Sequence, residues 1–467
     1  MREYQIRIEP FQYTALQDLT IRHEVNRHAQ ASVAMRIRDK DRERYLSVLA
    51  QQTWVKIEGV GEPEEAEEVR MILFYGVVTD FRFDCDGYET ILKLYLSSGT
   101  VLMDQRTHFR VFQNKDALCS SIAERLTASY QEGRCVCAAG QDGRIDGVLI
   151  QYHESDWEFI RRMEARNGHF LVPDITRKGV RYTIGLPDGI RREAPTDRFG
   201  FRLDVEEYMQ KNQNGIDTLK PEDMLELILE DREVCRIGDS LAYQGREYFA
   251  WRIETGYDGA ECMHTCYFRT KEALMTLPDT HQEAAGCSFD AVVTAVKQDK
   301  VQLDIKGDEW QAADGRNWFL YSTVYSSADG TGWYCMPEIG DCVRLYIPER
   351  EEDSFVLSAV HKETDTARQD PDRKSFRTKY GKEILFTPEA ILLTNNQGMR
   401  LEMNDKEGIT ISSDKDVVID AKDNLTISSA NASLMIAAKD KVQVRQGSTS
   451  MTLDGDIYFT GGEFRIQ

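Results

Sequence analysis

The sequence concentrates groups capable of general acid–base catalysis in one stretch, YHESDWEFIRRME. The candidate residues are His153, Glu154, Asp156, Glu158 and Glu164. Carboxylates and a histidine can donate and abstract protons when they share a cleft with a substrate. On side-chain chemistry alone, this stretch is the first candidate for an active site.

The same stretch has the pattern of a helix start, which accounts for its composition better. Ser155 and Glu158 have the spacing of a capping box, in which each side chain bonds the backbone N–H of the other residue. Asp156 suits the positive end of the helix dipole, Trp157 begins the apolar face, and the other carboxylates are expected on the solvated face. No Gly-x-Ser-x-Gly elbow or phosphate-binding glycine loop occurs in the sequence. We therefore predict no catalytic residue, no cofactor and no enzyme activity.

Two cysteine patterns invite a metal interpretation. Cys135 and Cys137 stand closer together than the usual zinc hook allows. Cys262, His264 and Cys266 alternate, so that a strand would place them on one face, but no second half-site stands nearby. Free thiols in a reducing cytosol are the expected state, and no metal site is predicted.

Charge and hydropathy exclude several classes of partner. The chain has 467 residues and a net charge of −21, and no basic stripe offsets it. Such a surface repels nucleic acid and anionic lipid. No segment approaches the length of apolar sequence that a membrane helix needs. The N-terminal sequence MREYQIRIEPFQY lacks the apolar core of a signal peptide, so synthesis and assembly are expected in the cytoplasm, with any export by another route.

The first 284 residues are rich in expected strands. Runs such as VRMILFYGVVTDFRF and TILKLYLSS lie between glycine and aspartate breaks in residues 1–110. Helices are expected at 114–130, with Asn114 as N-cap, from the capping box to Gly168, and at 221–229. The predicted N-terminal region, 1–284, is therefore mainly β with a few helices.

Residues 285–362 contain five short expected strands, near 288–296, 300–306, 317–325, 341–347 and 354–361. Five strands in this length suggest a small closed barrel of the oligonucleotide/oligosaccharide-binding type. Nucleic-acid binding would require basic grooves beside stacking aromatics, whereas this segment is acidic. We expect its aromatic residues to fill a core or a seam between subunits. They are Trp310, Trp318, Tyr321, Tyr325, Trp333 and Tyr334.

A polar linker is expected at 363–382, and apolar pairs then recur through 383–467. Their spacing is eight residues from Leu401 to Ile427, and it slips by one residue further along the chain. Within a pair the spacing is two, which indicates a strand with one buried face. One octad supplies only one face of a solenoid, so we predict three chains wound into an intertwined trimeric β-helix, a triangular prism. A small single-chain meander is the alternative. The predicted core pairs are Leu401, Met403, Ile409, Ile411, Val417, Ile419, Leu425 and Ile427.

This order of parts resembles the VgrG family, the spike proteins of type VI secretion and related contractile injection systems. The resemblance covers essentially the whole chain and rests on two local motifs. The first comprises Glu154, Ser155, Asp156, Trp157 and Glu158, and the second Gly332, Trp333, Pro337, Gly340 and Asp341. Cys342 and Glu338 depart from the second motif, where the family commonly has Glu and Arg.

The resemblance implies a mainly β, multidomain protein with phage-hub-like β-barrel domains in 1–284, an OB-fold barrel and a β-helix spike. It implies a homotrimer seated on an inner tube protein within a baseplate, which punctures a target membrane while carrying a tip protein or effectors. The particle would assemble in the cytoplasm and be delivered to or through the target membrane on firing. Alternatives are the tail hub-spike of a contractile phage and a trimeric spike adhesin or hydrolase.

The last strand is expected to end in an unfinished apolar surface. Some phage spikes close this end with a metal held by His-x-His motifs, but no histidine follows His361. The resemblance therefore implies a separate PAAR-like tip protein, and no C-terminal effector domain is expected after Gln467. The expected docking residues are Glu463, Phe464, Arg465, Ile466 and Gln467.

Overall fold

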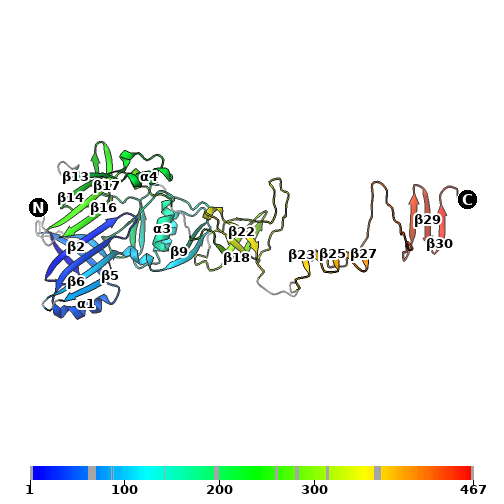
Figure 1. The fold of residues 1–467 in the computed structure, drawn as a ribbon, viewed down its shortest axis with the longest axis horizontal. Coiled ribbons are helices and arrows are strands. Elements are labelled where there is room, and N and C mark those ends of the chain that lie inside the picture. The colour runs from blue at the N-terminus through cyan, green and yellow to red at the C-terminus, as the bar shows by residue number, and fades with distance from the viewer. Residues whose placement is uncertain are drawn as a thin grey trace. The chain divides into compact units, whose positions relative to one another are not determined.

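The computed structural model describes residues 4–61, 70–85, 87, 89–140, 142–193, 199–257, 261–278, 283–311, 315–361 and 370–463. The chain is mainly β and forms several separate sheets, as predicted. It divides into two compact units, Met1–Lys362 and Glu363–Gln467 (Figure 1). Each unit is described by itself below.

A twelve-stranded sheet dominates the first unit. Its strands alternate buried and more exposed side chains, as β3 does, because successive side chains point to opposite faces. The main path runs β1-β4-β5-β6-β3-β2-β16-β17-β14-β13, and β15 joins β12 to β16. The first six strands are β1 (Tyr4–Glu9), β2 (Ala15–Glu24), β3 (Gln30–Ile37), β4 (Trp54–Gly61), β5 (Arg70–Cys85) and β6 (Thr90–Ser98). The others are β12 (Arg191–Arg192), β13 (Phe199–Leu203), β14 (Leu225–Asp231), β15 (Ser240–Tyr243), β16 (Arg246–Tyr257) and β17 (Cys262–Arg269).

The two expected barrel-like parts of 1–284 are joined in the described residues. One core gathers residues of β1–β6, including Ile8 and Met35. A second core gathers residues of the later strands, including Leu227 and Phe268. Antiparallel pairing of β2 with β16 connects the two halves into one sheet. Backbone groups on β2 and β16 find partners across the join, which satisfies both edges.

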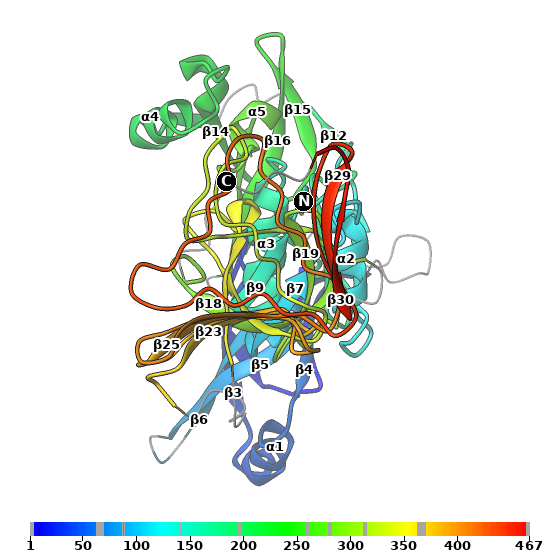
Figure 2. The ribbon, with the colours of Figure 1, turned by 90° about the vertical axis from the view of Figure 1, so that its right-hand side faces the viewer.

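Helices and smaller sheets complete the part of this unit that precedes residue 285. None of the described helices is long and apolar enough to cross a membrane. Figure 2 shows α1 and α4 at opposite ends of the first unit. The helices are α1 (Arg42–Leu49), α2 (Cys119–Thr127), α3 (Asp156–Ala165), α4 (Val205–Gln213) and α5 (Lys271–Leu274). The additional strands are β7 (Thr107–Phe112), β8 (Arg134–Cys137), β9 (Leu149–Ser155), β10 (Leu171–Pro173) and β11 (Arg181–Ile184).

Two of the predicted helix positions are wrong. α2 begins at Cys119 instead of 114, because the Asn114 side chain accepts the N–H of Asp116 at 3.1 Å and closes a turn before the helix. At 221–229 only Pro221–Met224 forms a 3₁₀ turn, and the chain then continues as β14. Pairing of β14 with β13 and β17 outweighs the local helical preference.

The five strands expected in 285–362 form, and they close into a barrel in the order β18-β19-β20-β22-β21. Its core includes Val293, Leu303 and Leu345. The strands are β18 (Ser288–Lys297), β19 (Lys300–Ile305), β20 (Phe319–Tyr321), β21 (Cys342–Tyr346) and β22 (Phe355–Ala359).

The β7–β9 ribbon belongs to two cores at once. Val111 and Ile150 are part of the barrel core, whereas their neighbours Phe112 and Leu149 pack with α2 and α3. This follows from the alternation of side chains along a strand. The ribbon therefore packs against the barrel with one face and against the helices with the other.

Two histidines of the large sheet are buried and uncharged. Burial lowers the pKa of His23 to about 4, against the raising effect of Pro173 O and Asp174 and with a lowering contribution from Arg236. Burial also lowers the pKa of His264 to about 4, opposed by Asp231 and assisted by Arg192. Both rings therefore stay neutral in the folded first unit at neutral pH.

We expect acid to destabilise the first unit through these histidines. Below about pH 6.5 the unfolded chain protonates them while the folded chain does not, so the free energy of unfolding falls as the pH drops from 6.5 towards 4. Urea unfolding at pH 7 and pH 5 measures this loss. A His264→Gln variant should lose less stability over this interval, whereas His153→Gln, at an exposed residue, should behave as the parent. Equal losses in the parent and in His264→Gln would contradict the expectation.

The second unit consists of two antiparallel meanders. β23 lies inside the segment expected to be a linker, so the first sheet begins at residue 374. The five-stranded sheet contains β23 (Lys374–Arg377), β24 (Glu383–Phe386), β25 (Ala390–Thr394), β26 (Arg400–Asn404) and β27 (Gly408–Ser412). The three-stranded sheet contains β28 (Val442–Gln446), β29 (Thr449–Asp454) and β30 (Asp456–Thr460).

The strand pairing within both sheets is that of a single-chain meander. From the sequence, this meander is the alternative to three chains wound around a common axis. Each strand pairs with the next one along the chain. Between the two sheets, residues 413–441 form no strand in the described chain, although the octad pattern predicts strands there. An extended segment needs a neighbouring strand to satisfy its backbone groups, and this segment has none among the residues that the structure describes.

Candidate functional site

Helix α3 begins at the predicted capping box. Ser155 Oγ accepts the N–H of Glu158 at 3.1 Å, and the Ser155 N–H donates to Glu158 Oε2 at 2.9 Å. The Ser155 hydroxyl donates to Asp104 Oδ1 at 2.5 Å. Trp157 packs in the core behind this turn. The local spacing of Ser and Glu thus fixes where the helix starts.

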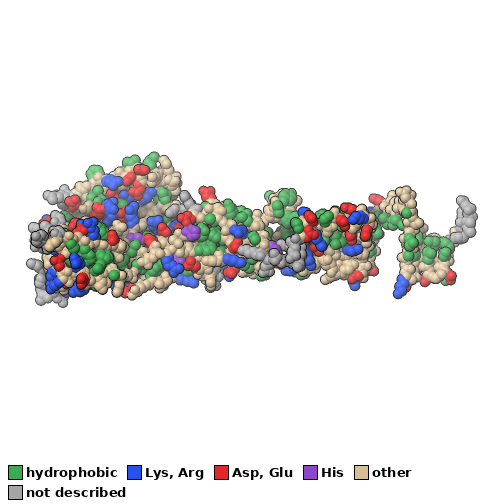
Figure 3. Space-filling model, turned by 60° about the horizontal axis from the view of Figure 1, so that its bottom comes forward, with side chains coloured by type: hydrophobic (Ala, Val, Ile, Leu, Met, Phe, Trp, Pro, Cys, Tyr) green, Lys and Arg blue, Asp and Glu red, His purple; other side chains and the backbone are tan. Residues whose placement is uncertain are grey.

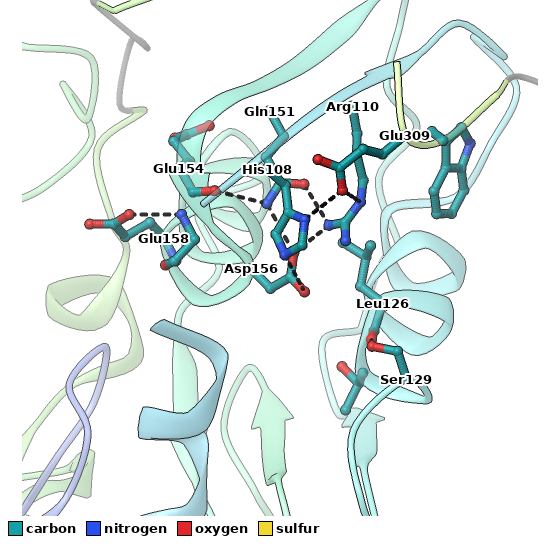
Figure 4. A network of polar contacts seen from close by, with 12 residues as sticks. His108, Arg110, Leu126, Ser129, Gln151, Glu154, Asp156, Glu158 and Glu309 are labelled. Carbon is teal, nitrogen blue, oxygen red and sulfur yellow. Dashed lines mark hydrogen bonds and ion pairs between the residues drawn. The ribbon is translucent and has the colours of Figure 1, made fainter. Parts of the chain in front are cut away.

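Asp156 lies in a buried network at the start of the helix (Figure 4). The solvated face was expected for the other carboxylates, and that expectation is wrong for Glu154 and Glu164, which are buried. Its carboxylate accepts from Arg110 Nη1 at 2.5 Å, Gln151 Nε2 at 2.9 Å and the Tyr130 hydroxyl at 2.7 Å. Burial, and then the neighbouring carboxylate, raises the pKa of Tyr130. The phenol therefore remains a hydrogen-bond donor to Asp156.

The network continues from the helix to the barrel segment through His108 and Glu309. His108 Nδ1 lies 2.7 Å from Glu309 Oε2, and Nε2 lies 4.0 Å from Asp156 Oδ2. The Glu309 carboxylate also accepts the N–H of Phe109 at 3.4 Å. Burial opposes ionisation, yet bonds from His108 and Phe109 lower the pKa of Glu309. A charged contact therefore joins β7 to the loop that follows β19.

Glu154 is buried as well, in an ionic junction with Arg162. Arg162 Nε and Nη2 donate to the two Glu154 oxygens at 2.7 and 2.8 Å, and Nη2 also donates to Ile150 O at 2.7 Å. Such a bidentate pair is geometrically specific and stronger than a neutral hydrogen bond.

The other side of Arg162 faces the barrel. Arg162 Nη1 donates to Glu351 Oε2 at 3.2 Å, and Arg166 Nη2 donates to the same oxygen at 2.5 Å. Glu351 lies on a short 3₁₀ turn, Glu351–Asp353, directly before β22. Burial would lower the pKa of Arg162, but Glu154 and Glu351 outweigh it and raise the pKa. The charge is therefore retained inside the protein and couples α3 to the barrel.

The acid–base candidates are thus distributed over different surroundings. His153 is exposed and lies 3.5 Å from Glu283, Glu158 caps the helix, and Glu164 pairs with His169 at 2.9 Å. Glu154 and Asp156 are held by separate arginines. Each of these groups thus makes a capping or ion-pair contact, and the contacts lie at different places in the fold.

The second motif forms the loop that leads into β21. Gly332 has φ 149°, and a Cβ there would lie 2.4 Å from Tyr325 O. The Trp333 N–H donates to the same carbonyl at 2.8 Å. Asp341 Oδ2 accepts the N–H of Glu338 at 2.8 Å, and the Gly340 N–H donates to Val293 O at 2.9 Å. Pro337 is buried, so this motif fixes a turn against the barrel.

The aromatic residues of the barrel segment differ in burial. Trp310 is packed between Phe112, at a ring distance of 4.6 Å, and the Arg125 guanidinium, at 3.7 Å. Tyr325, Trp333 and Tyr334 are exposed. Of the two expected positions, a core or a seam between subunits, the core is therefore excluded for these three residues and the seam stays a prediction.

The cysteine patterns do not assemble a metal-binding group among the described residues. His264 and Cys266 lie on the same face of β17 and are buried, as the alternation predicts. Burial raises the pKa of Cys135 and of Cys262 to about 11. These thiols therefore stay protonated near neutral pH.

The five-stranded sheet of the second unit has one apolar face. Register places Ile384, Leu393, Leu401 and Ile411 side by side across four strands. A second row runs parallel to the first. It contains Phe386, Ile391, Met403 and Ile409.

This apolar face is largely open to solvent in the single chain. Ile409 is 72% exposed and Ile411 is 62% exposed. Patches of this kind are uncommon on monomers and mark interaction surfaces. The three-stranded sheet repeats the arrangement, because Val444, Met451 and Phe459 are register partners (Figure 3).

The predicted spike core thus divides into two groups. Leu401, Met403, Ile409 and Ile411 share one sheet face, as predicted. The remaining pairs lie in the segment without strands and are exposed. They are Val417, Ile419, Leu425 and Ile427. Of the predicted docking residues, Glu463 is exposed, and Phe464, Arg465, Ile466 and Gln467 lie outside the described residues.

No family model and no curated protein matches the sequence. Solved structures nevertheless match the fold. One is the E. coli c3393 protein, a component of the type VI secretion system with structural similarity to T4 bacteriophage tail proteins gp27 and gp5. It matches with TM-score 0.51 and 13% identity, and the match covers 76% of this chain and 100% of that chain. A half-lidded Francisella PdpA–VgrG complex matches with TM-score 0.56 and 10% identity, covering 88% of each chain. A lidless PdpA–VgrG complex matches with TM-score 0.54 and 9% identity, covering 88% and 98%. The chain has the fold of VgrG-like spike and phage-tail-like proteins.

Proposed function

We propose that the protein is the trimeric central hub and spike of a contractile injection machine. The observation that carries this proposal is the apolar face of the five-stranded sheet, exposed in a single chain whose fold is VgrG-like. Three such faces turned inward would form a closed triangular core. Full burial of one large aliphatic side chain stabilises by about 1.5–3 kcal/mol, and each chain contributes two rows of them.

In this trimer, residues 413–441 become strands. Val417, Ile419, Leu425 and Ile427 continue the spacing of the preceding pairs, and strands from the other two chains would supply the missing backbone partners. The prism is then an intertwined β-helix in this segment. The meanders on either side of it form the faces already seen in one chain.

The five-stranded barrel acts in this proposal as an OB-fold collar at the base of the spike. Its strand order, β18-β19-β20-β22-β21 with closure, supports that assignment. Tyr325, Trp333 and Tyr334 would then lie in seams between the three collars. The buried junction of Arg162 with Glu351 transmits force from collar to hub without a flexible joint.

The hub would seat on an inner tube protein within a baseplate, and the particle would carry a tip protein or effectors. Two of the similar structures are PdpA–VgrG complexes, which supports partnership with a further protein. The role is mechanical, without catalysis. Assembly is in the cytoplasm, and firing delivers the spike to or through the target membrane.

A phage tail hub-spike is the second candidate function. The c3393 protein is itself described as structurally similar to T4 tail proteins, so the fold favours both settings. The two differ in the surrounding machine and share the trimeric spike.

Native mass measurement of the full-length protein tests the proposal directly. A particle of three 53.6 kDa chains is expected, with a protruding needle in low-resolution images. A stable monomer at micromolar concentration would exclude the spike. It would also leave the apolar faces without an occupant.

The end of the spike provides a separate test. We expect deletion of 463–467 to abolish binding of a PAAR-like tip protein while the trimer persists, because the last strand layer offers unpaired backbone groups to a partner. Co-purification of the tip protein with the deleted and parent chains measures the effect. Unchanged capture by the deleted chain would place the docking surface elsewhere.

A further inference from the structure

A cavity of about 590 Å³ lies in the first unit, between the large sheet and the small sheet β10-β11-β8. Ile21 and Ile253 line it from the large sheet, and Val172 lines it from the small sheet. Ile237 contributes a further apolar surface. Its size is within the range of ligand-binding pockets.

Arginines dominate the solvent-reaching part of this cavity. Arg134 and Arg181 are direct register partners on β8 and β11, and Arg236 lines the same cavity. Among the described residues none of the three has a carboxylate partner within ion-pair distance: Arg181 donates to Lys178 O at 2.8 Å and Arg236 to Ile72 O at 3.3 Å. Like charges directly opposite each other destabilise a sheet, and a bound anion would relieve this repulsion.

The acidic groups of the lining do not neutralise these arginines. Asp174 accepts from the N–H and hydroxyl of Thr176 and lies 4.0 Å from Arg177. Asp239 pairs with Arg192 at 3.0 Å. Asp188 is exposed. A protein with a net charge of −21 thus has a locally cationic cavity.

The inner wall carries two buried neutral histidines. His23 Nε2 lies 2.8 Å from Pro173 O, and a carbonyl can only accept, so Nε2 carries the proton and Nδ1 is a bare acceptor. Nδ1 has no partner among the described residues. His264 Nδ1 bonds the Thr255 hydroxyl at 2.7 Å. Both rings line the cavity, which therefore has an apolar, uncharged interior with a few polar atoms.

We propose that this cavity binds a small amphipathic carboxylate, with its apolar body against Ile21, Val172 and Ile253 and its carboxylate beside Arg134, Arg181 and Arg236. Guanidinium groups bind carboxylates through paired N–H donors. The site is formed within one chain, so it goes beyond the spike function and does not depend on it.

Three probes with the same dodecyl chain separate the contributions: dodecanoate, dodecanol and dodecyltrimethylammonium, each below its micelle concentration. Calorimetric titration of the full-length protein should give one dodecanoate per chain. Its dissociation constant should be about tenfold lower than those of the other two, because only the carboxylate accepts charge-assisted hydrogen bonds from the arginines. No saturable binding, or equal affinity for all three probes, would overturn the proposal.

A pair of variants tests the assignment of the arginines. Arg134→Gln/Arg181→Gln should weaken dodecanoate binding about tenfold and leave dodecanol binding unchanged. Arg144→Gln is the matched control, because Arg144 is an exposed arginine paired with Asp116 outside the lining. Equal dodecanoate affinity in the double variant and the control would refute the site. Val172→Trp should fill the cavity and abolish binding of both probes, and the arginine variants test the proposal independently should this variant fail to fold.

Discussion

Ile411→Asp is expected to abolish the proposed trimer while the first unit remains folded. Ile411 belongs to the exposed apolar row of the five-stranded sheet, between Leu401 on the next strand and solvent. In the proposed prism three copies of the aspartate would meet in an apolar core, at a cost of several kcal/mol per chain. Sedimentation analysis of the full-length variant should show a single chain of 53.6 kDa, with an unchanged unfolding transition of the first unit.

Ser412→Asp is the control for this change. Ser412 follows Ile411 on the same strand, so its side chain points to the opposite face, and its register partner is Arg400. This variant should remain trimeric. A trimeric Ile411→Asp protein would contradict the inward placement of the apolar face, even if the parent protein is a trimer.

Arg162→Met is expected to lower the free energy of unfolding of the first unit by about 3–5 kcal/mol. The change leaves the buried Glu154 without its bidentate partner and removes one of two arginines from Glu351. An uncompensated buried charge is costly, whereas replacement of a whole ion pair by apolar groups often is not. Urea unfolding followed by tryptophan fluorescence measures the loss, since Trp157 lies on the same helix.

Arg161→Met provides the matched control for the junction. Arg161 precedes Arg162 on α3 and is exposed, so its replacement should change stability by less than about 0.5 kcal/mol. Equal effects of the two substitutions would show that the Arg162 junction contributes no more than a surface charge.

The start of α3 shows what short-range pattern can predict. Ser155 and Glu158 bond each other's backbone, and both partners lie within one helical turn. Such an interaction depends only on spacing, so the sequence specifies it. The octad pattern predicted the shared face of Leu401 and Met403 for the same reason. Side chains two residues apart on a strand point to the same face, whichever strand lies beside it.

The burial of Glu154 and Glu164 shows where short-range pattern fails. Asp156 is bound by Arg110, 46 positions away, and Arg162 reaches Glu351, 189 positions away. A carboxylate on a helix looks solvated in the sequence unless such partners are known. The 221–229 segment failed similarly, because β13 and β17 flank it as strands only in the folded sheet.

The sequence by itself therefore determined the mainly β class, the strand positions of the barrel, the α3 cap and the apolar face of the octads. Each of these depends on contacts within a few residues or on the alternation of side chains. Only the tertiary structure decided that one sheet joins the two halves of the region before residue 285. It also decided that the α3 carboxylates are buried and that Arg134 and Arg181 lie side by side at a cavity. Those features depend on contacts between segments that are far apart in the sequence. A pattern read over a few neighbouring residues does not include both partners of such a contact.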